Sequence, residues 1–336
     1  MRKTIVLLCV FQLFMACKSS EEEVMVYRGE ALGTTYQVKY FGEQIGMEKA
    51  LDSIFEDINA SMSTYREESD ISRINAGDTL VTVNDHFREV FEASRRVYQE
   101  SNGYFDPTVG ILVNAYGFGP EKQLEEPEKA TLDSLRAYVG FNRLQLSSDN
   151  KVKKDSAKVY LDFNAIAKGF TIDVIARYLD SKAIDNYLIE LGGELVAKGR
   201  NLAKQDEWLV AIDDPRQEKG ERKFQAILAL KDQAMATSGN YRKFRVDSAT
   251  GNRYVHTINP LTGLAEKSNL LSASVLAENC MLADAYATAF MALGLERSRE
   301  MLEKLDGVEV YFIYAEDDKQ KVSVFASEGF KKALRE

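Results

Sequence analysis

Two oxygen-bearing side chains, Asp284 and Thr288, stand four residues apart in the segment Ala283-Asp284-Ala285-Tyr286-Ala287-Thr288. On a helix, residues at this spacing project from the same face. A carboxylate and a hydroxyl are hard oxygen ligands of the kind that Mg²⁺ prefers. The same segment also fits a helix with one solvated Asp and an ordinary Thr, so the pair alone leaves both interpretations open.

A second candidate segment, residues 161–169, passes from a predicted strand into a predicted helix. Free N–H groups at the start of a helix attract phosphate, and Lys168 adds a positive charge there. Asp162 could accept a hydrogen bond from a base or a sugar. The glycine spacing of a P-loop is absent, and a helix capped by Asn164 is the simpler interpretation of the segment taken alone.

The chain has two histidines, His86 and His256. His86 lies among polar residues at a predicted helix start, where a capping or solvated role is expected. His256 lies on a predicted strand just before the turn Asn259-Pro260-Leu261-Thr262-Gly263. Because imidazole titrates near neutral pH, His256 is a candidate general base, although a structural role fits the sequence equally well.

Aromatic residues alternate with glycines in residues 102–110 and 116–120. Such rings can stack on a planar ligand while the backbone reads its edge, and a packed surface loop is the alternative. Residues 104–129 are predicted to be loop-like because they are rich in Gly and Pro. The hydroxyls of Thr237 and Ser238, before Gly239, add a weak signal at a predicted strand end.

The elements that must position these residues are mixed in type. Apolar spacing predicts helices over about 47–62, 87–98 and 132–139, after Lys168, and from about 279 and 296. Two strands within 24–41 meet at Gly33, and further strands are predicted over 159–163, 187–191, 195–198, 208–212, 224–230, 234–237, 241–246, 253–258, 271–276, 308–314 and 322–325. Blocks of strands and helices without strict alternation predict an α+β fold with mixed, mostly antiparallel sheets packed with helices. We expect residues 24–336 to form one compact catalytic unit.

The first residues resemble a bacterial lipoprotein signal. Two basic residues precede the apolar run Ile5–Met15, which is too short to span a bilayer as a helix. Ala16-Cys17 and a polar stretch follow. We therefore expect residues 1–16 to be a signal peptide, Cys17 to be lipidated and residues 17–23 to be a tether, with an ordinary cleaved signal as the alternative. Processing would leave Cys280 as a lone cysteine, with no intramolecular disulfide.

Composition bounds the function. The 336 residues are 45% hydrophobic, which is enough for a sizeable core. Lys and Arg number 43 against 52 Asp and Glu, a net charge of −9. A general nucleic-acid binder would have a basic balance, so we expect no nucleic-acid partner.

The joint order of the motifs is more informative than any one of them. In chain order they are Gly33-Thr34, Met62-Ser63-Thr64-Tyr65, Ser72-Arg73-Ile74-Asn75, Phe105-Asp106-Pro107-Thr108-Val109-Gly110, Ala167-Lys168-Gly169, Gly192-Gly193-Glu194, Thr237-Ser238-Gly239-Asn240-Tyr241, His256-Thr257-Ile258-Asn259-Pro260-Leu261-Thr262-Gly263 and Ala283-Asp284-Ala285. This set, from about residue 28 to 315, closely resembles the FAD:protein FMN transferases, the ApbE flavin transferase family.

The resemblance implies a reaction and a site. FAD and a Ser or Thr hydroxyl of a target protein would give a phosphoester-linked FMN and AMP. Mg²⁺ would be held by Asp284, the Thr288 hydroxyl and the Ala165 carbonyl, and His256 would take the hydroxyl proton. Asp284 and His256 are thus the implied catalytic residues. The residues implied to line the FAD site are Leu32, Tyr65, Tyr104, Phe105, Asp106, Asp162, Lys168, His256 and Ile258.

Two residues depart from the family pattern. Leu32 stands where Met is usual, a conservative apolar change. Asn259 replaces the usual Asp, so it keeps the shape and turn propensity but loses a charge. The site survives if that side chain mainly shapes the turn, and activity is in doubt if its charge is needed.

The resemblance also implies a location and partners. Family members are commonly bacterial lipoproteins, so we expect a lipid-anchored protein of the cell envelope that faces away from the cytoplasm. Its partners would be FAD, the membrane and a membrane or exported redox protein as FMN acceptor. The alternatives are an Mg²⁺-dependent FAD pyrophosphatase, a flavin-holding lipoprotein without turnover, and a substrate-binding lipoprotein, which would need two lobes and a hinge.

Overall fold

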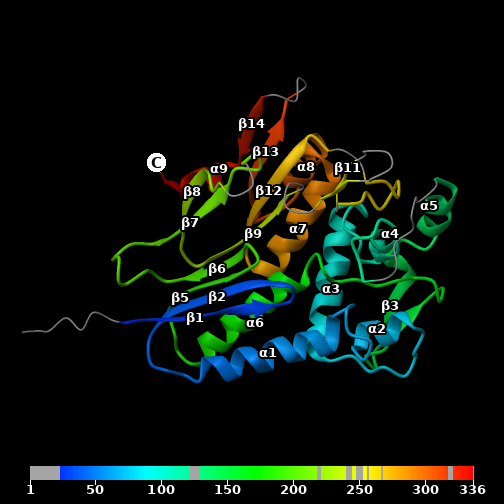
Figure 1. The fold of residues 1–336 in the computed structure, drawn as a ribbon, viewed down its shortest axis with the longest axis horizontal. Helices are drawn as coiled ribbons and strands as arrows, with labels where there is room; N and C mark the ends of the chain where they lie inside the picture. Colours follow the sequence, from blue (N-terminus) through cyan, green and yellow to red (C-terminus); the bar gives the residue numbers. More distant parts are fainter. Residues whose placement is uncertain are drawn as a thin grey trace, which may run out of the picture.

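The computed structural model describes residues 23–120, 129–217, 221–239, 244–246, 253–255, 257–265, 268–316 and 321–335. Within them, a large antiparallel sheet has long helices on one face and a smaller sheet on the other (Figure 1). This arrangement is the mixed α+β architecture that the sequence predicts.

The large sheet has eight strands among the described residues. Their spatial order is β1 (Val24–Ala31), β2 (Thr34–Phe41), β5 (Asn186–Leu191), β6 (Glu194–Lys198), β9 (Gln233–Gly239), β12 (Leu270–Ala277), β13 (Glu309–Ala315) and β14 (Val322–Ala326). All neighbouring strands are antiparallel. Successive side chains of a strand point to opposite faces, and β13 shows the result. Val310 and Phe312 join the core under the helices, whereas Tyr311 and Ile313 join the core under the small sheet.

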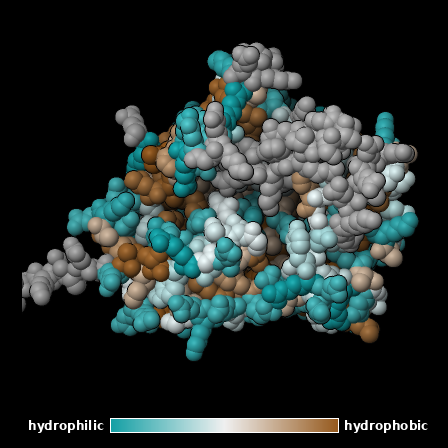
Figure 2. Space-filling view, viewed as in Figure 1, coloured by the Kyte–Doolittle hydropathy of each residue, from teal (hydrophilic) through white to brown (hydrophobic). Residues whose placement is uncertain are grey.

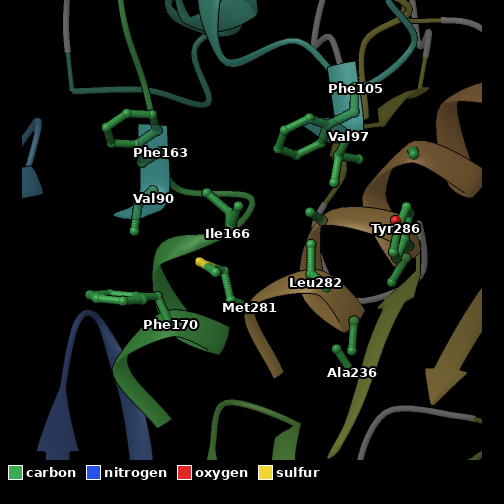
Figure 3. Close-up of a cluster of buried hydrophobic side chains, with 14 of the residues drawn as sticks. Val90, Val97, Phe105, Phe163, Ile166, Phe170, Ala236, Met281, Leu282 and Tyr286 are labelled. Atoms are coloured by element: carbon green, nitrogen blue, oxygen red, sulfur yellow. The ribbon is translucent and has the colours of Figure 1, made fainter. Parts of the chain in front are cut away.

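The main helices cover one face of this sheet. They are α1 (Met47–Met62), α3 (Asp85–Glu100), α6 (Ala167–Ser181) and α7 (Cys280–Leu293). Helix α7 is buried on almost all sides, as expected for a helix rich in Ala, Met and Phe. Figure 3 shows part of the resulting core, in which Ile166 and Met281 lie between α6 and α7. The buried position of α7 places Asp284 inside the molecule.

The shorter elements lie mostly around α3 and at the C-terminal end. The helices are α2 (Asp70–Asn75), η1 (Pro107–Val109), α4 (Gly110–Ala115), α5 (Lys129–Arg136), η2 (Phe141–Arg143), α8 (Leu295–Leu302) and α9 (Glu328–Ala333). Two small antiparallel pairs are β3 (Leu144–Leu146) with β4 (Val152–Lys154), and β10 (Phe244–Val246) with β11 (Arg253–Val255).

Two sequence expectations about these regions are wrong. The segment predicted to be loop-like from residue 104 contains η1 and α4. Residues 159–163, predicted to be a strand, pair with no strand. Instead the Leu161 N–H donates to the Asn75 side chain, and the Asp162 N–H donates to the Pro107 carbonyl. This apolar segment therefore forms hydrogen bonds with residues distant in the sequence instead of pairing with a neighbouring strand.

The smaller sheet consists of β15 (Leu334–Arg335), β8 (Phe224–Leu230) and β7 (Trp208–Asp213). Its inner face packs on the large sheet, where Trp208 contacts the Phe41 ring. Its outer face exposes Leu209, Phe224 and Ile227, and Figure 2 shows apolar side chains gathered over this sheet. Among the described residues, no helix is both long and apolar enough to cross a membrane.

Candidate active site

Strand ends meet the N-terminal turns of α6 and α7 at one edge of the large sheet. The hairpin turn between β1 and β2 lies at this edge, and so does the Gly192-Gly193 turn between β5 and β6. The two turns are close neighbours, since the Thr34 side chain packs against Gly192. The C-terminal end of β9 lies beside the first residues of β12. Lys168, Glu194, Ser238, Asp284 and Thr288 gather at this edge.

The centre of the site is a buried ion cluster. The Lys168 ammonium lies 2.6 Å from Glu194 Oε1 and 3.4 Å from Asp284 Oδ2. The Glu194 and Asp284 side chains are 5% and 3% exposed, so both carboxylates are removed from water. Burial alone would lower the pKa of the ammonium, but the charges of Asp284 and Glu194 outweigh it and raise that pKa above its usual value. Lys168 is therefore a fixed cation at neutral pH.

Gly169 explains how α6 comes close enough to α7 to build this cluster. A Cβ atom at this position would lie 2.2 Å from the Cys280 carbonyl oxygen and 2.9 Å from the Asp284 Cβ. With only hydrogen there, the Gly169 N–H donates to Asp284 Oδ2 at 3.1 Å. The start of α6 thus binds a carboxylate of this chain, as expected for a helix N-terminus.

Hydroxyl groups continue the site from Asp284 along α7. Thr288 lies one turn after Asp284, and its Oγ1 lies 3.4 Å from Ser238 Oγ. Thr237 Oγ1 lies 2.8 Å from Ser274 Oγ on the adjacent strand β12. The helical spacing expected for Asp284 and Thr288 is present: the Asp284 carboxylate contacts the start of α6, and the Thr288 hydroxyl contacts the end of β9.

Ala165 lies in the turn that precedes α6. Phe163 and Ile166, on either side of it, are fully buried in the core with Phe170 (Figure 3). These anchors fix the backbone of the turn, where a carbonyl ligand would have to lie. The expectation that Asn164 caps the helix is wrong, because Ile166 occupies the cap position and the Asn164 N–H donates to Asp162 Oδ1.

A second group of predicted site residues lies around Asp162. The Asp106 carboxylate accepts hydrogen bonds from the N–H and hydroxyl of Thr108, and the next residue, Pro107, accepts the Asp162 N–H. Burial raises the pKa of Asp106 to about 6 and also raises that of Asp162. Tyr65 is mostly exposed, and burial together with the Asp162 charge raises its pKa. Residues 161–168 therefore join this group to the ion cluster.

The aromatic and apolar candidates lie on several elements. Phe105 is buried in the main core. The Arg297 guanidinium lies over the Tyr104 ring, 5.5 Å from the ring centroid. Arg297 also lines a cavity of about 350 Å³, together with Thr257, Asn259, Ser268, Asn269 and residues 291–294. Ile258 is buried beside α4. The structure therefore places Phe105 and Ile258 in separate parts of the core, and the Tyr104 ring lies close to a residue that lines this cavity.

The Asn259 side chain and backbone shape the turn that follows Ile258. The Asn259 side-chain oxygen accepts the Leu261 N–H at 3.0 Å, and its backbone carbonyl accepts the Gly263 N–H at 2.8 Å. An amide oxygen performs this turn-shaping role as well as a carboxylate does. His256, the predicted base, lies outside the described residues, between the end of β11 at Val255 and this turn.

Leu32 lies at the tip of the β1–β2 hairpin with φ +50°, followed by Gly33 with φ +73°. Two residues with positive φ suit a tight hairpin, but a leucine in this conformation costs roughly 1–2 kcal/mol. Its side chain packs against the cores under α1 and α7. The Leu32 side chain is therefore held in a fixed place at the tip of this hairpin.

Two acidic residues that sequence reasoning left without a role are part of this architecture. Glu194 belongs to the Gly-Gly-Glu motif, but its ion pair with Lys168 spans 26 residues of sequence and leaves no local pattern. Asp173 accepts the N–H groups of Cys280 and Met281, and so fixes the start of α7 to α6. The sequence signal that could have identified Asp173 is that it is a single acidic residue flanked by apolar residues of the same helix.

Fold and site together define an α+β protein with two buried carboxylates, a lysine and partly buried hydroxyls gathered at strand ends and helix starts. The model of the ApbE family matches residues 32–312. A Haemophilus influenzae protein named FAD:protein FMN transferase is 34% identical, with 91% of each chain covered. A Vibrio cholerae protein of the same name is 36% identical, with 99% of each covered. The solved structure of the flavin transferase ApbE from Vibrio cholerae superposes with a TM-score of 0.83 at 35% identity, covering 93% of this chain and 99% of that one. The chain belongs to the ApbE family.

Proposed function

We propose that this protein is an Mg²⁺-dependent FAD:protein FMN transferase. The oxygen of a Ser or Thr hydroxyl in the acceptor protein attacks the phosphorus on the FMN side of the FAD diphosphate. The bond from that phosphorus to the AMP oxygen breaks, AMP leaves, and the hydroxyl proton passes to a base. The observation that carries the proposal is the buried Lys168–Asp284 pair beside Thr288, in a chain whose relatives bear this activity in their names.

The residues present fit a magnesium ion. Asp284, Thr288 and the Ala165 carbonyl supply oxygen atoms only, which suits a hard cation. Two buried carboxylates face one ammonium in the cluster, and burial raises the pKa of Glu194, so the cluster is short of positive charge. Glu194 Oε2 is buried without a hydrogen-bond partner among the described residues. When bound, Mg²⁺ would neutralise charge on the diphosphate and on the departing AMP.

The protein's own groups would position the two substrates. Lys168 offers a permanent positive charge for the diphosphate, and transfer at a diphosphate depends mainly on charge neutralisation and alignment. The rest of the FAD site would be lined by Leu32, Tyr65, Tyr104, Phe105, Asp106, Asp162 and Ile258. His256 would accept the hydroxyl proton, since histidine is the side chain that most often serves as a general base.

We further propose that the protein works at the bacterial cell envelope, facing away from the cytoplasm. The Ala16-Cys17 junction after a short apolar run supports lipidation of Cys17. The acyl chains would hold the protein at a membrane, near a membrane or exported redox protein that accepts FMN.

Paired variants test the metal and base assignments. Asp284→Ala should abolish Mg²⁺-dependent AMP release and acceptor flavinylation, because it removes the one charged ligand of the proposed set. His256→Ala should slow transfer by about 10²–10⁴-fold while FAD still binds. Asp180→Ala, which removes an exposed acid on α6, is the matched control and should keep the wild-type rate. A wild-type rate in Asp284→Ala at low Mg²⁺, with unchanged folding, would contradict the metal assignment.

A further inference from the structure

Lys168 and a metal ion would both be drawn to the Asp284 carboxylate. Asp284 Oδ2 lies 3.4 Å from the Lys168 ammonium and already accepts the Gly169 N–H. A divalent cation bound to either oxygen of this carboxylate would be repelled by an ammonium that lies so close to it. The availability of Asp284 to the cation therefore depends on which carboxylate holds the Lys168 ammonium most closely.

That charge is Glu194. The Lys168 ammonium is 0.8 Å closer to Glu194 than to Asp284, since the two distances are 2.6 and 3.4 Å. Attraction between charges rises as their separation falls, and it is strong where water is excluded. Glu194 Oε2 has no partner among the described residues, so Lys168 provides the main compensation for this buried carboxylate.

The backbone around Glu194 holds its carboxylate in place. The Gly192 N–H donates to the Thr35 carbonyl, and the Gly193 N–H donates to Glu190 Oε1. A Cβ atom on Gly192 would lie 2.8 Å from Thr34 Cγ2 and 3.4 Å from Glu194 Oε2. The two glycines, both at positive φ, thus let the turn close tightly against the buried carboxylate.

We propose that Glu194 is a positioning residue that draws the Lys168 ammonium away from Asp284, and so keeps Asp284 available to a divalent cation. This inference rests on the proposed Mg²⁺ site. It assigns Glu194 no contact with the cation or with FAD. When the cation binds, Lys168 stays paired with Glu194 beside the site, where its charge can meet the diphosphate.

A double-mutant cycle measured by Mg²⁺ titration calorimetry, without FAD or acceptor, tests the proposal. Glu194→Gln keeps the shape but removes the charge, so Lys168 turns to Asp284 and Mg²⁺ affinity falls by about 10–100-fold. In a Lys168→Met background the competitor is gone, and Glu194→Gln should change Mg²⁺ affinity less than about twofold. Glu89→Gln, an exposed acid paired with Arg177, is the control and should bind as wild type does.

Different failures have different meanings. An equal loss of affinity from Glu194→Gln in both backgrounds, in proteins with wild-type circular dichroism, would overturn the inference, because Glu194 would then act as a ligand or through the fold. Glu194→Asp, made in the protein that keeps Lys168, is a second variant in case Glu194→Gln fails to fold. It keeps the charge but shortens the reach, and it should also weaken Mg²⁺ binding; unchanged binding would overturn the inference. Wild-type protein that binds no Mg²⁺ would overturn both this inference and the metal part of the proposed function.

Discussion

Replacing Gly169 with alanine should damage the site by forcing two helices apart. The new Cβ would lie 2.2 Å from the Cys280 carbonyl oxygen and 2.7 Å from its carbonyl carbon, and neither backbone atom can rotate away. Asp173 also fixes this end of α7 by accepting the Cys280 and Met281 N–H groups. The helices must therefore separate, which moves Asp284 relative to Lys168.

The size of the effect follows from two opposing terms. Overpacking a tight contact costs about 1–3 kcal/mol, and a backbone clash of this kind belongs at the upper end. Alanine gains about 1 kcal/mol over glycine in helix propensity. We expect a net loss of about 2 kcal/mol in the free energy of unfolding, together with weaker Mg²⁺ binding.

Denaturant unfolding followed by the fluorescence of Trp208, the single tryptophan, measures the first quantity, and calorimetry measures the second. Gly307→Ala is the control. Its Cβ meets nothing within 4 Å, but its φ of +71° is unfavourable for alanine, so it should lose about 1 kcal/mol with unchanged Mg²⁺ affinity. A Gly169→Ala protein with wild-type stability and Mg²⁺ affinity would refute the close-packing account.

Three further outcomes are expected. Burial raises the pKa of Asp173 to about 6, above its unfolded value, so the folded state binds more protons and stability falls as pH rises from about 4 to about 6. Asp173→Asn should remove up to about 3 kcal/mol of this pH-dependent loss in the free energy of unfolding, as measured by thermal melts between about pH 4 and about pH 6. A variant whose stability depends on pH as the wild type does would contradict this prediction. Thr288→Val should weaken Mg²⁺ binding less than Asp284→Ala, since water can replace a neutral hydroxyl; calorimetry that ranks them in reverse would refute this. Cys17→Ser should move the protein from the membrane to the soluble fraction with activity intact, and retention at the membrane would refute lipidation.

Sequence periodicity predicted the elements that bury an apolar face. The spacing of Leu51, Phe55, Ile58 and Met62 identified α1, and all four side chains are buried. Residues 224–230 were predicted as a strand with the bounds that the structure has. Where backbone hydrogen bonds go to distant groups, as from Leu161 to the Asn75 side chain, periodicity alone predicts the wrong element.

The candidate site could be predicted only where residue type carries a signal. Asp284 and Thr288 were found from their helical spacing, and Lys168 from its place at a helix start. The competition between Lys168 and a cation for Asp284 could not be predicted, because it depends on contacts that span 26 and 116 residues. A carbonyl ligand such as that of Ala165 has no residue-type signature, so only the family resemblance suggested it.

Intact-mass spectrometry of an acceptor domain from an exported redox protein tests protein flavinylation most directly. The domain is incubated with this protein, FAD and Mg²⁺, beside a variant whose acceptor Ser or Thr is replaced by Ala. We predict that the acceptor gains the mass of an esterified FMN with matching release of AMP, and that the Ala variant gains nothing. Release of free FMN and AMP with no mass added to the acceptor would contradict protein flavinylation and identify a hydrolase.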